Sequence, residues 1–159
     1  MELFDNLRAE QKFFLIAGPC VVEDLTIMHK IAEKLVTLTR KRNINLIFKA
    51  SFQKANRTSI ESYSGPGTEE GLRILSEIKS TYNVPILTDI HETIQVKAAA
   101  EVADILQIPA FLSRQTYLIS EAAKSGRIIN IKKGQFMAPE DMLSAIGKVT
   151  AENNFQILL

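Results

Sequence analysis

Cationic side chains recur in this sequence where an apolar run gives way to polar residues. Five positions share this feature: Lys49, Lys54, Arg57, Arg114 and Lys132. Segment 54–59 is the densest, because an amide and two hydroxyls accompany its lysine and arginine. Guanidinium, ammonium and hydroxyl groups are donors for phosphate and carboxylate. A solvated polar loop is the simpler explanation of one such run. The recurrence favours a site for an anionic, hydroxyl-rich substrate.

Four further residues follow or end apolar runs, and each admits more than one interpretation. Cys20 is either a small buried hydrophobe or a thiolate ligand for a metal. Asp89 and His91 would share one face of a strand. They could bind hydroxyls, act as acid and base or ligate a metal, unless Asp89 only caps a helix. Gln107 adds a neutral donor, whereas Arg114 taken alone is typical of a surface.

The elements that must position these residues alternate along the chain. Apolar runs predict strands at residues 13–17, 46–48, 85–88, 105–108, 128–131 and 155–159. Helical spacing and boundary residues predict helices within 25–42, 72–78, 96–102 and 114–125, and from 139 onward. Residues 1–12 predict a short helix or an arm. Lys49 lies inside the second strand itself, where an ammonium must point into the mouth of a barrel or lose its hydration at a large cost.

Six strands alternating with five helices indicate an α/β protein with a parallel sheet. An open sheet and a closed barrel both satisfy this order. Polar residues follow strand after strand, as at the mouth of a barrel, whereas an open sheet gathers its ligand groups at one switch point. No glycine-rich nucleotide loop is present. The sequence therefore predicts a (β/α)8 barrel.

The predicted barrel is a single domain over residues 1–159, with no linker. A complete barrel takes about 250 residues, and this chain has 159. The last predicted strand would leave an apolar edge if nothing followed it. We therefore expect the chain to cover about the first six strands and five helices of a longer protein.

Composition excludes several classes of function. Lys and Arg (19) nearly balance Asp and Glu (18), so no global field attracts nucleic acid or a membrane surface. The chain has no Trp and three Tyr, which disfavours a base-stacking surface. Its single Cys excludes an intrachain disulfide and fits a reducing compartment. We expect a cytoplasmic protein, because no signal peptide or membrane-spanning stretch is visible.

Five motifs, in order, closely resemble those of the 3-deoxy-D-manno-octulosonate 8-phosphate synthases. They are Ala17-Gly18-Pro19-Cys20, Phe48-Lys49-Ala50-Ser51-Phe52 with residues 54–59, Thr88-Asp89-Ile90-His91-Glu92, residues 107–112 with 114–116, and residues 130–136. The resemblance runs from about residue 13 to the end. The related heptulosonate 7-phosphate synthases carry a Lys-Pro-Arg-Thr-Ser-like loop, so Lys-Ala-Asn-Arg-Thr-Ser favours the octulosonate branch.

This resemblance implies a transferase with a (β/α)8 barrel, usually a homotetramer. Such enzymes condense phosphoenolpyruvate with D-arabinose 5-phosphate and release inorganic phosphate by C–O cleavage. The product enters 3-deoxy-D-manno-octulosonate (KDO) and lipopolysaccharide synthesis. Two alternatives remain open: a synthase that uses erythrose 4-phosphate, or an inactive barrel fragment that binds sugar phosphates.

The resemblance also implies roles for individual residues. By this resemblance, phosphoenolpyruvate contacts Lys49, Lys54 and Lys132, and its phosphate lies near the Ala110 backbone. Contacts to the sugar phosphate fall to Asn56, Arg57 and Thr58. Asp89 and Gln107 belong near the sugar or the reacting centre, and Arg114 near a phosphate, within its subunit or across a boundary. Catalytic roles fall to Lys54, Asp89 and Lys132, while that of His91 stays open.

Cys20 carries the metal prediction. The family divides into metal-dependent members with Cys at this position and metal-independent members with Asn, so the resemblance implies a divalent ion of the Fe, Zn or Mn class. The remaining ligands of the family come from later strands, beyond Leu159. We therefore expect the 159-residue chain alone neither to bind metal well nor to catalyse the reaction.

Overall fold

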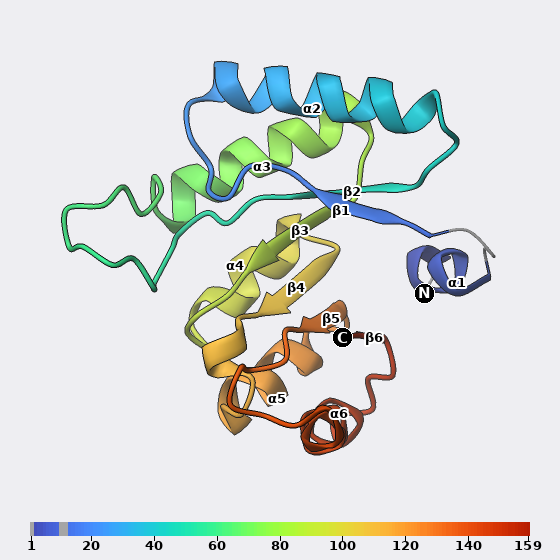
Figure 1. The fold of residues 1–159 in the computed structure, drawn as a ribbon, viewed down its shortest axis with the longest axis vertical. Coiled ribbons are helices and arrows are strands. Elements are labelled where there is room, and N and C mark those ends of the chain that lie inside the picture. Colours follow the sequence, from blue (N-terminus) through green and yellow to red (C-terminus); the bar gives the residue numbers. More distant parts are fainter. Residues whose placement is uncertain (1, 10–12) are drawn as a thin grey trace. The chain divides into compact units, whose positions relative to one another are not determined.

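The computed structural model describes residues 2–9 and 13–159. The chain divides into two compact units, Met1–Thr88 and Asp89–Leu159, which run from blue to red in Figure 1. Each unit consists of parallel strands and the helices that connect them. Residues 10–12, at the end of the segment predicted as a short helix or an arm, lie outside the described residues.

The first unit contains three parallel strands and three helices. In chain order these are α1 (Glu2–Ala9), β1 (Leu15–Ala17), α2 (Leu25–Arg40), β2 (Leu46–Lys49), α3 (Thr68–Tyr82) and β3 (Ile86–Asp89), whose last residue opens the second unit. β1 pairs with β2 from Leu15↔Leu46 to Ala17↔Phe48, and β2 pairs with β3 at Phe48↔Ile86. α1 confirms the helical form of the N-terminal prediction.

Local chemistry explains where these elements begin and end. The Asp24 carboxylate accepts from the Ile27 amide at 3.1 Å and caps α2. α3 ends at Asn83, whose φ of 50° is left-handed, a conformation that Asn adopts more readily than most residues. β2 lies in the core because Ile47 and Phe48 are almost completely buried.

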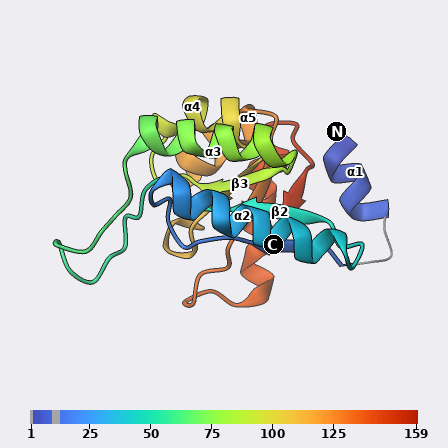
Figure 2. The same ribbon diagram turned by 90° about the horizontal axis from the view of Figure 1, so that it is seen from above.

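α2 and α3 pack side by side in the first unit (Figure 1 and Figure 2). The His29 ring lies 5.6 Å from the Tyr82 ring, and its Nε2 lies 3.2 Å from the Glu77 carboxylate. Burial raises the pKa of the Tyr82 hydroxyl. On the exposed face of α3, hydrogen bonds from Arg73 lower the pKa of Glu70. The contacts of His29 with Tyr82 and Glu77 thus join two consecutive β/α units.

The second unit repeats the pattern with three more strands. After the end of β3 it contains α4 (Gln95–Val102), β4 (Ile105–Ile108), η1 (Ala110–Leu112), α5 (Thr116–Lys124), β5 (Ile128–Ile131), η2 (Pro139–Asp141), α6 (Met142–Thr150) and β6 (Ile157–Leu158). β4 pairs with β5 from Ile105↔Ile128 to Ile108↔Ile131, and β5 pairs with β6 at Ile129↔Ile157. All these pairs are parallel, and α5 packs against α6.

Successive parallel β/α pairs confirm the α/β class and are the arrangement of part of a (β/α)8 barrel. The described residues contain the six predicted strands and, in α2–α6, the five predicted helices. Several boundaries were wrong. β1 begins at Leu15 and is only half-buried, and β6 is limited to Ile157–Leu158. Within the described residues, no helix is long and apolar enough to cross a membrane.

Candidate functional site at the carboxyl ends of the strands

The segments that follow β1 and β2 run side by side. A Cβ at Gly18 would lie 2.0 Å from the Lys49 carbonyl oxygen, so only glycine permits this approach. Three residues on, Val21 pairs with Ser51, and the Val22 amide donates to the Ser51 oxygen at 2.9 Å. The carboxyl ends of the first two strands thus carry their polar residues at one edge of the first unit.

Lys49 and Cys20 extend from this edge. Lys49 is half-buried at the end of β2, and its Nζ donates to the Ser51 hydroxyl at 3.0 Å. Ser51 is itself completely buried. Cys20 is exposed, which contradicts its interpretation as a small buried hydrophobe. An accessible thiol and a partly desolvated ammonium therefore come from neighbouring segments.

The loop after β2 carries Lys54, Asn56, Arg57 and Thr58 away from the strand. Figure 1 shows it extending beyond the end of β2 before the chain returns to α3. The Lys54 amide donates to the Ser64 oxygen at 2.7 Å, which closes the base of the loop. The last three of these site residues are exposed, and Lys54 is half-buried. The loop is therefore closed at its base and presents polar groups outward.

Arg57 is held in place by the returning half of the loop. Its Nε donates to the Tyr63 carbonyl at 2.9 Å, and the Tyr63 hydroxyl donates to the Val22 carbonyl at 3.0 Å. In the described part of the chain, Arg57 forms no ion pair. The guanidinium is thus oriented by a backbone oxygen without being neutralised by a carboxylate, as an oxyanion site requires.

Two glycines let the loop return closely over Phe52. A Cβ at Gly65 would lie 2.4 Å from the Phe52 carbonyl oxygen, and Gly65 has a φ of 108°. A Cβ at Gly71, in α3, would lie 2.5 Å from the Phe52 Cβ. Phe52 is completely buried between these contacts. This packing fixes the base of the loop that carries Lys54–Ser59.

In the second unit, three polar side chains form a hydrogen-bonded row across the strand ends. Gln107 Nε2 donates to Asp89 Oδ1 at 2.5 Å, and Asn130 Nδ2 donates to Gln107 Oε1 at 2.8 Å. Gln107 and Asn130 are register partners on β4 and β5, so their side chains share a face of the sheet. Asp89 and Gln107 are buried. We call this set the amide relay.

The relay excludes the simpler interpretation of Asp89 as a helix cap. Ile94 is the N-cap residue of α4, and no side chain forms a capping hydrogen bond there. The turn before the helix uses Gln95, whose Oε1 accepts from the His91 and Glu92 amides at 2.8 and 3.2 Å. The Asp89 carboxylate instead accepts from Gln107.

Ala110 and Lys132 lie at neighbouring strand ends of the same unit. The Lys132 amide donates to the Ile108 oxygen at 3.1 Å, and a Cβ at Gly134 would lie 3.1 Å from the Ala110 oxygen. Lys133 Nζ donates to the Gly134 and Met137 oxygens, both at 2.9 Å. Among the described residues, Lys132 has no side-chain partner. The two lysines therefore differ: Lys133 donates to backbone oxygens of the loop, whereas Lys132 has no such contact among the described residues.

Arg114 lies beside a separate small cavity. It is exposed, and its carbonyl accepts from Lys148 Nζ at 2.7 Å. The cavity has a volume of about 260 Å³ and is lined by Arg114, Lys148 and Asp141, among others. Arg114 forms no ion pair within the described residues. Among the described residues, no hydrogen bond or ion pair joins Arg114 to the amide relay.

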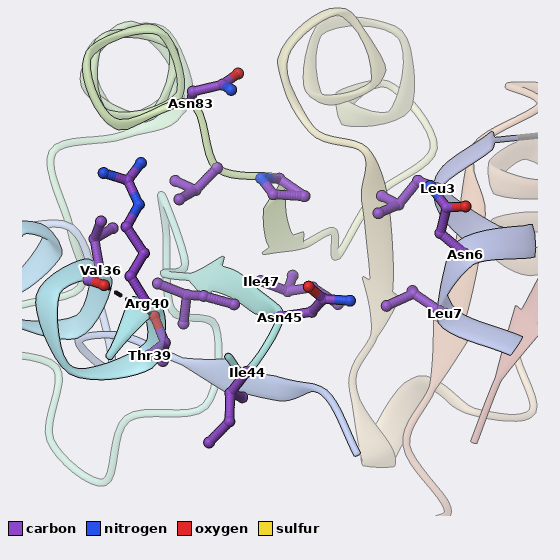
Figure 3. Close-up of a pocket in the computed structure, with 13 residues that line it drawn as sticks. Leu3, Asn6, Leu7, Val36, Thr39, Arg40, Ile44, Asn45, Ile47 and Asn83 are labelled. Atoms are coloured by element: carbon purple, nitrogen blue, oxygen red, sulfur yellow. Dashed lines mark hydrogen bonds between the residues drawn. The ribbon is translucent and has the colours of Figure 1, made fainter. Parts of the chain in front are cut away.

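Another cavity, of about 280 Å³, lies in the first unit and contains none of the predicted site residues (Figure 3). Leu3 and Leu7 of α1 face it from one side, and Val36 and Arg40 of α2 from another. Pro85, which precedes β3, also lines it. This cavity is therefore at the amino ends of the strands, and it is not the candidate site.

The described residues do not form a metal site on their own. Cys20 is exposed and could supply one thiolate, but no group of three or more His, Cys, Asp or Glu side chains lies together in the described part of the chain. Zinc sites in proteins have three or four protein ligands. The donor set present here does not fit a complete site.

The structure groups the predicted residues within each unit. Cys20 and Lys49 come from adjacent segments, Lys54, Asn56, Arg57 and Thr58 from one loop, Asp89 and Gln107 from one hydrogen bond, and Ala110 and Lys132 from neighbouring strand ends. Two participants were missed as site residues. Asn130 was visible as a polar residue inside an apolar strand, and Ser51 as a hydroxyl two residues after Lys49.

Parallel β/α units with cationic, amide and carboxylate groups at their carboxyl ends define a protein of the barrel class. A family model described as the DAHP synthetase I family matches residues 8–159. The chain belongs to this family.

Curated relatives narrow the similarity further. Proteins named 2-dehydro-3-deoxyphosphooctonate aldolase from Geobacter metallireducens, Geobacter sulfurreducens and Fusobacterium nucleatum are 54%, 49% and 52% identical to this chain. The alignments cover 91%, 97% and 94% of this chain, but 53%, 57% and 54% of those relatives. The chain thus spans about half the length of the curated relatives it matches.

Proposed function

We propose that this chain is the first part of a 3-deoxy-D-manno-octulosonate 8-phosphate synthase. The enzyme condenses phosphoenolpyruvate with D-arabinose 5-phosphate and releases inorganic phosphate, for KDO and lipopolysaccharide synthesis. The observation that carries the proposal is the identity of about half of all residues to relatives named for this product. The Lys-Ala-Asn-Arg-Thr-Ser loop at 54–59 supports the octulosonate branch.

The first unit supplies cations for two anionic substrates in this proposal. Lys49 and Lys54 bind the phosphoenolpyruvate carboxylate and phosphate as point charges. Arg57, oriented by the Tyr63 carbonyl, presents a guanidinium fork to the phosphate of the sugar, while Asn56 and Thr58 bind its oxygens. The exposure of these three residues suits groups that meet a ligand entering from solvent.

The second unit supplies the groups nearest the reacting carbons. Lys132 and the Ala110 backbone bind phosphoenolpyruvate, and Arg114 binds a phosphate. Asp89, held by Gln107, orients the hydroxyls or the aldehyde of the sugar.

The chemistry follows from the substrates and these groups. The enol carbon of phosphoenolpyruvate attacks the aldehyde carbon, and the aldehyde oxygen takes up a proton. Water adds to the adjacent cationic carbon and gives a tetrahedral phosphorylated intermediate. The C–O bond to phosphate then breaks, which leaves the ketone and inorganic phosphate. Lysine and arginine side chains stabilise the anionic charge, and fixing both substrates supplies a large part of the rate.

The proposal includes a site for a divalent ion of the Fe, Zn or Mn class, to which Cys20 contributes one ligand. The described residues provide no complete ligand set, and we propose, from the resemblance, that ligands beyond Leu159 complete it. No step above depends on the ion. We further propose a cytoplasmic homo-oligomer, a tetramer by resemblance, that binds neither nucleic acid nor membrane.

The proposal is tested by phosphate release from phosphoenolpyruvate in the presence of arabinose 5-phosphate. The assay compares the protein encoded by the complete gene, which we call the full chain, with the 159-residue chain. We expect release by the first and little by the second. Release only with erythrose 4-phosphate would make the protein a heptulosonate synthase. Binding of both sugar phosphates without release by the full chain would leave a binding module.

A further inference from the structure

We infer that Asn130 is a positioning residue, which fixes the orientation of the Gln107 amide and, through it, of the Asp89 carboxylate. The inference rests on the proposed function for its kinetic consequence, but its geometry stands on the described second unit alone. Asn130 lies on β5 in register with Gln107 on β4. It is joined to Asp89 only through Gln107 in the hydrogen bonds of the relay.

The hydrogen-bond polarity of the relay runs in one direction. The Gln107 amide turns its NH₂ end toward Asp89, with Nε2 donating to Oδ1 at 2.5 Å. The oxygen end of Gln107 must then face a donor, and Asn130 Nδ2 provides it at 2.8 Å. A reversed Gln107 amide would place oxygen against oxygen at Asp89 and NH₂ against NH₂ at Asn130. Each member therefore fixes the next.

The fixed polarity limits what this part of the site can bind. Asp89 is 4% exposed and Gln107 8% exposed, so a carboxylate that loses the hydrogen bond from Gln107 would be more costly to bury. A buried carboxylate repels phosphate and attracts hydroxyl donors. The relay therefore suits the hydroxyl-bearing carbons of the aldose, while the cations of the loops suit its phosphate. Asn130 acts on this selection without contacting the sugar.

An Asn130→Asp substitution tests the relay with almost no change in shape. At about pH 8 the introduced group is a carboxylate, which accepts hydrogen bonds and cannot donate. The Gln107 oxygen then faces a second acceptor and loses the hydrogen bond that Asn130 donates to it. We expect kcat/KM for arabinose 5-phosphate to fall about 10- to 100-fold, with KM for phosphoenolpyruvate changed by less than about threefold. As the pH falls toward about 5 the introduced carboxyl gains a proton, because partial burial and the facing Gln107 oxygen raise its pKa above the ordinary value of about 3.9. It can then donate, and we expect the deficit relative to the parent protein to shrink.

Asn154→Asp is the matched control. Asn154 is a buried asparagine of the same unit, and its Nδ2 donates to the Ala123 and Arg127 oxygens at 3.0 and 2.9 Å, outside the relay. This change can lower stability, but it should leave the pH dependence of kcat/KM like that of the parent. A deficit of Asn130→Asp that does not vary with pH, or that Asn154→Asp reproduces, would overturn the inference. Parental kinetics of Asn130→Asp at all pH values would also overturn it.

A second measurement separates this inference from the proposed function. The side-chain amide protons of Gln107 can be followed by NMR in the full chain. At about pH 8 we expect Asn130→Asp, but not Asn154→Asp, to shift these resonances and to speed their exchange with solvent relative to the parent at the same pH. At about pH 5 we expect this difference from the parent to shrink. If the parent protein is inactive with every sugar, the function fails while this spectrum still decides the relay. Unchanged Gln107 resonances in Asn130→Asp would contradict the relay even in an active enzyme.

Discussion

Gly18 offers a sharp test of how the carboxyl ends of β1 and β2 are held together. A Gly18→Ala substitution would place a methyl carbon 2.0 Å from the Lys49 oxygen. Carbon and oxygen atoms approach no closer than about 3.3 Å even in favourable contacts, so the two segments must separate by about 1.3 Å. The displaced atom is backbone, which cannot move aside as a flexible side chain does.

We expect Gly18→Ala to lower the free energy of unfolding by about 3 kcal/mol. Overpacking of this kind costs about 1–3 kcal/mol, and each weakened hydrogen bond beside it, such as Val22 N to Ser51 O, adds about 1 kcal/mol. Gly147→Ala is the control, because a Cβ there meets no atom within 4 Å and the residue lies inside α6. Alanine should stabilise this helix by about 0.5–1 kcal/mol.

Urea denaturation followed by circular dichroism measures both variants. With a slope of about 2 kcal/mol per M, the midpoint should fall by about 1.5 M for Gly18→Ala and rise slightly for Gly147→Ala. A change smaller than about 0.5 kcal/mol for Gly18→Ala would refute the close approach of these segments. Changes in the free energy of unfolding that have the same size and sign for the two substitutions would refute it too.

Three further predictions concern single side chains. Thr88→Val removes a buried hydroxyl that donates to the Ala50 oxygen at 2.8 Å, and urea unfolding should show a loss of about 1 kcal/mol; an unchanged midpoint would show that this bond adds no stability. Arg57→Lys keeps the charge but loses the Nε bond to Tyr63, so KM for the sugar phosphate should rise about tenfold in the phosphate-release assay. An equal rise for phosphoenolpyruvate would contradict separate binding. Cys20→Ala should keep the unfolding midpoint, because Cys20 is exposed, and should lower the metal bound per full chain in elemental analysis; unchanged metal content would remove Cys20 from the ligand set.

Much of the fold was predictable because apolar runs and strand burial have the same cause. Residues 46–48 and 105–108 are apolar runs in the sequence, apart from Gln107, and the strands occur there. The boundaries that failed depend on local competition. Pro139 was expected to open an α-helix, but residues 139–141 form a 3₁₀ turn whose Asp141 carboxylate accepts from the Ala138 amide, and α6 begins at Met142.

The last strand fails for a similar reason. Residues 155–159 are mostly apolar, which predicts a strand, yet the side chain of Asn154 accepts from the Gln156 amide at 2.9 Å. This turn delays pairing until Ile157. A side chain that competes with the strand for a backbone donor leaves no signal in hydrophobic periodicity.

The candidate site was predictable in its residue types but not in its connections. In the sequence, Lys49 and Arg57 come at or after the second apolar run, and Lys132 follows the fifth. This was enough to predict that all three lie near the carboxyl ends of strands. Spacing alone could not show that Asp89 binds Gln107, or that Asn130 completes the relay. Those contacts depend on strand register across residues that are 18 and 23 positions apart, which a single sequence does not specify.

The central claim is the choice of aldose, and the ratio of two rate constants tests it most directly. Phosphate release from phosphoenolpyruvate by the full chain should give kcat/KM for arabinose 5-phosphate about 100-fold or more above that for erythrose 4-phosphate. A site built to bind a hydroxyl strongly rejects an analogue that lacks it. A ratio near one, or a preference for the four-carbon sugar, would contradict the account.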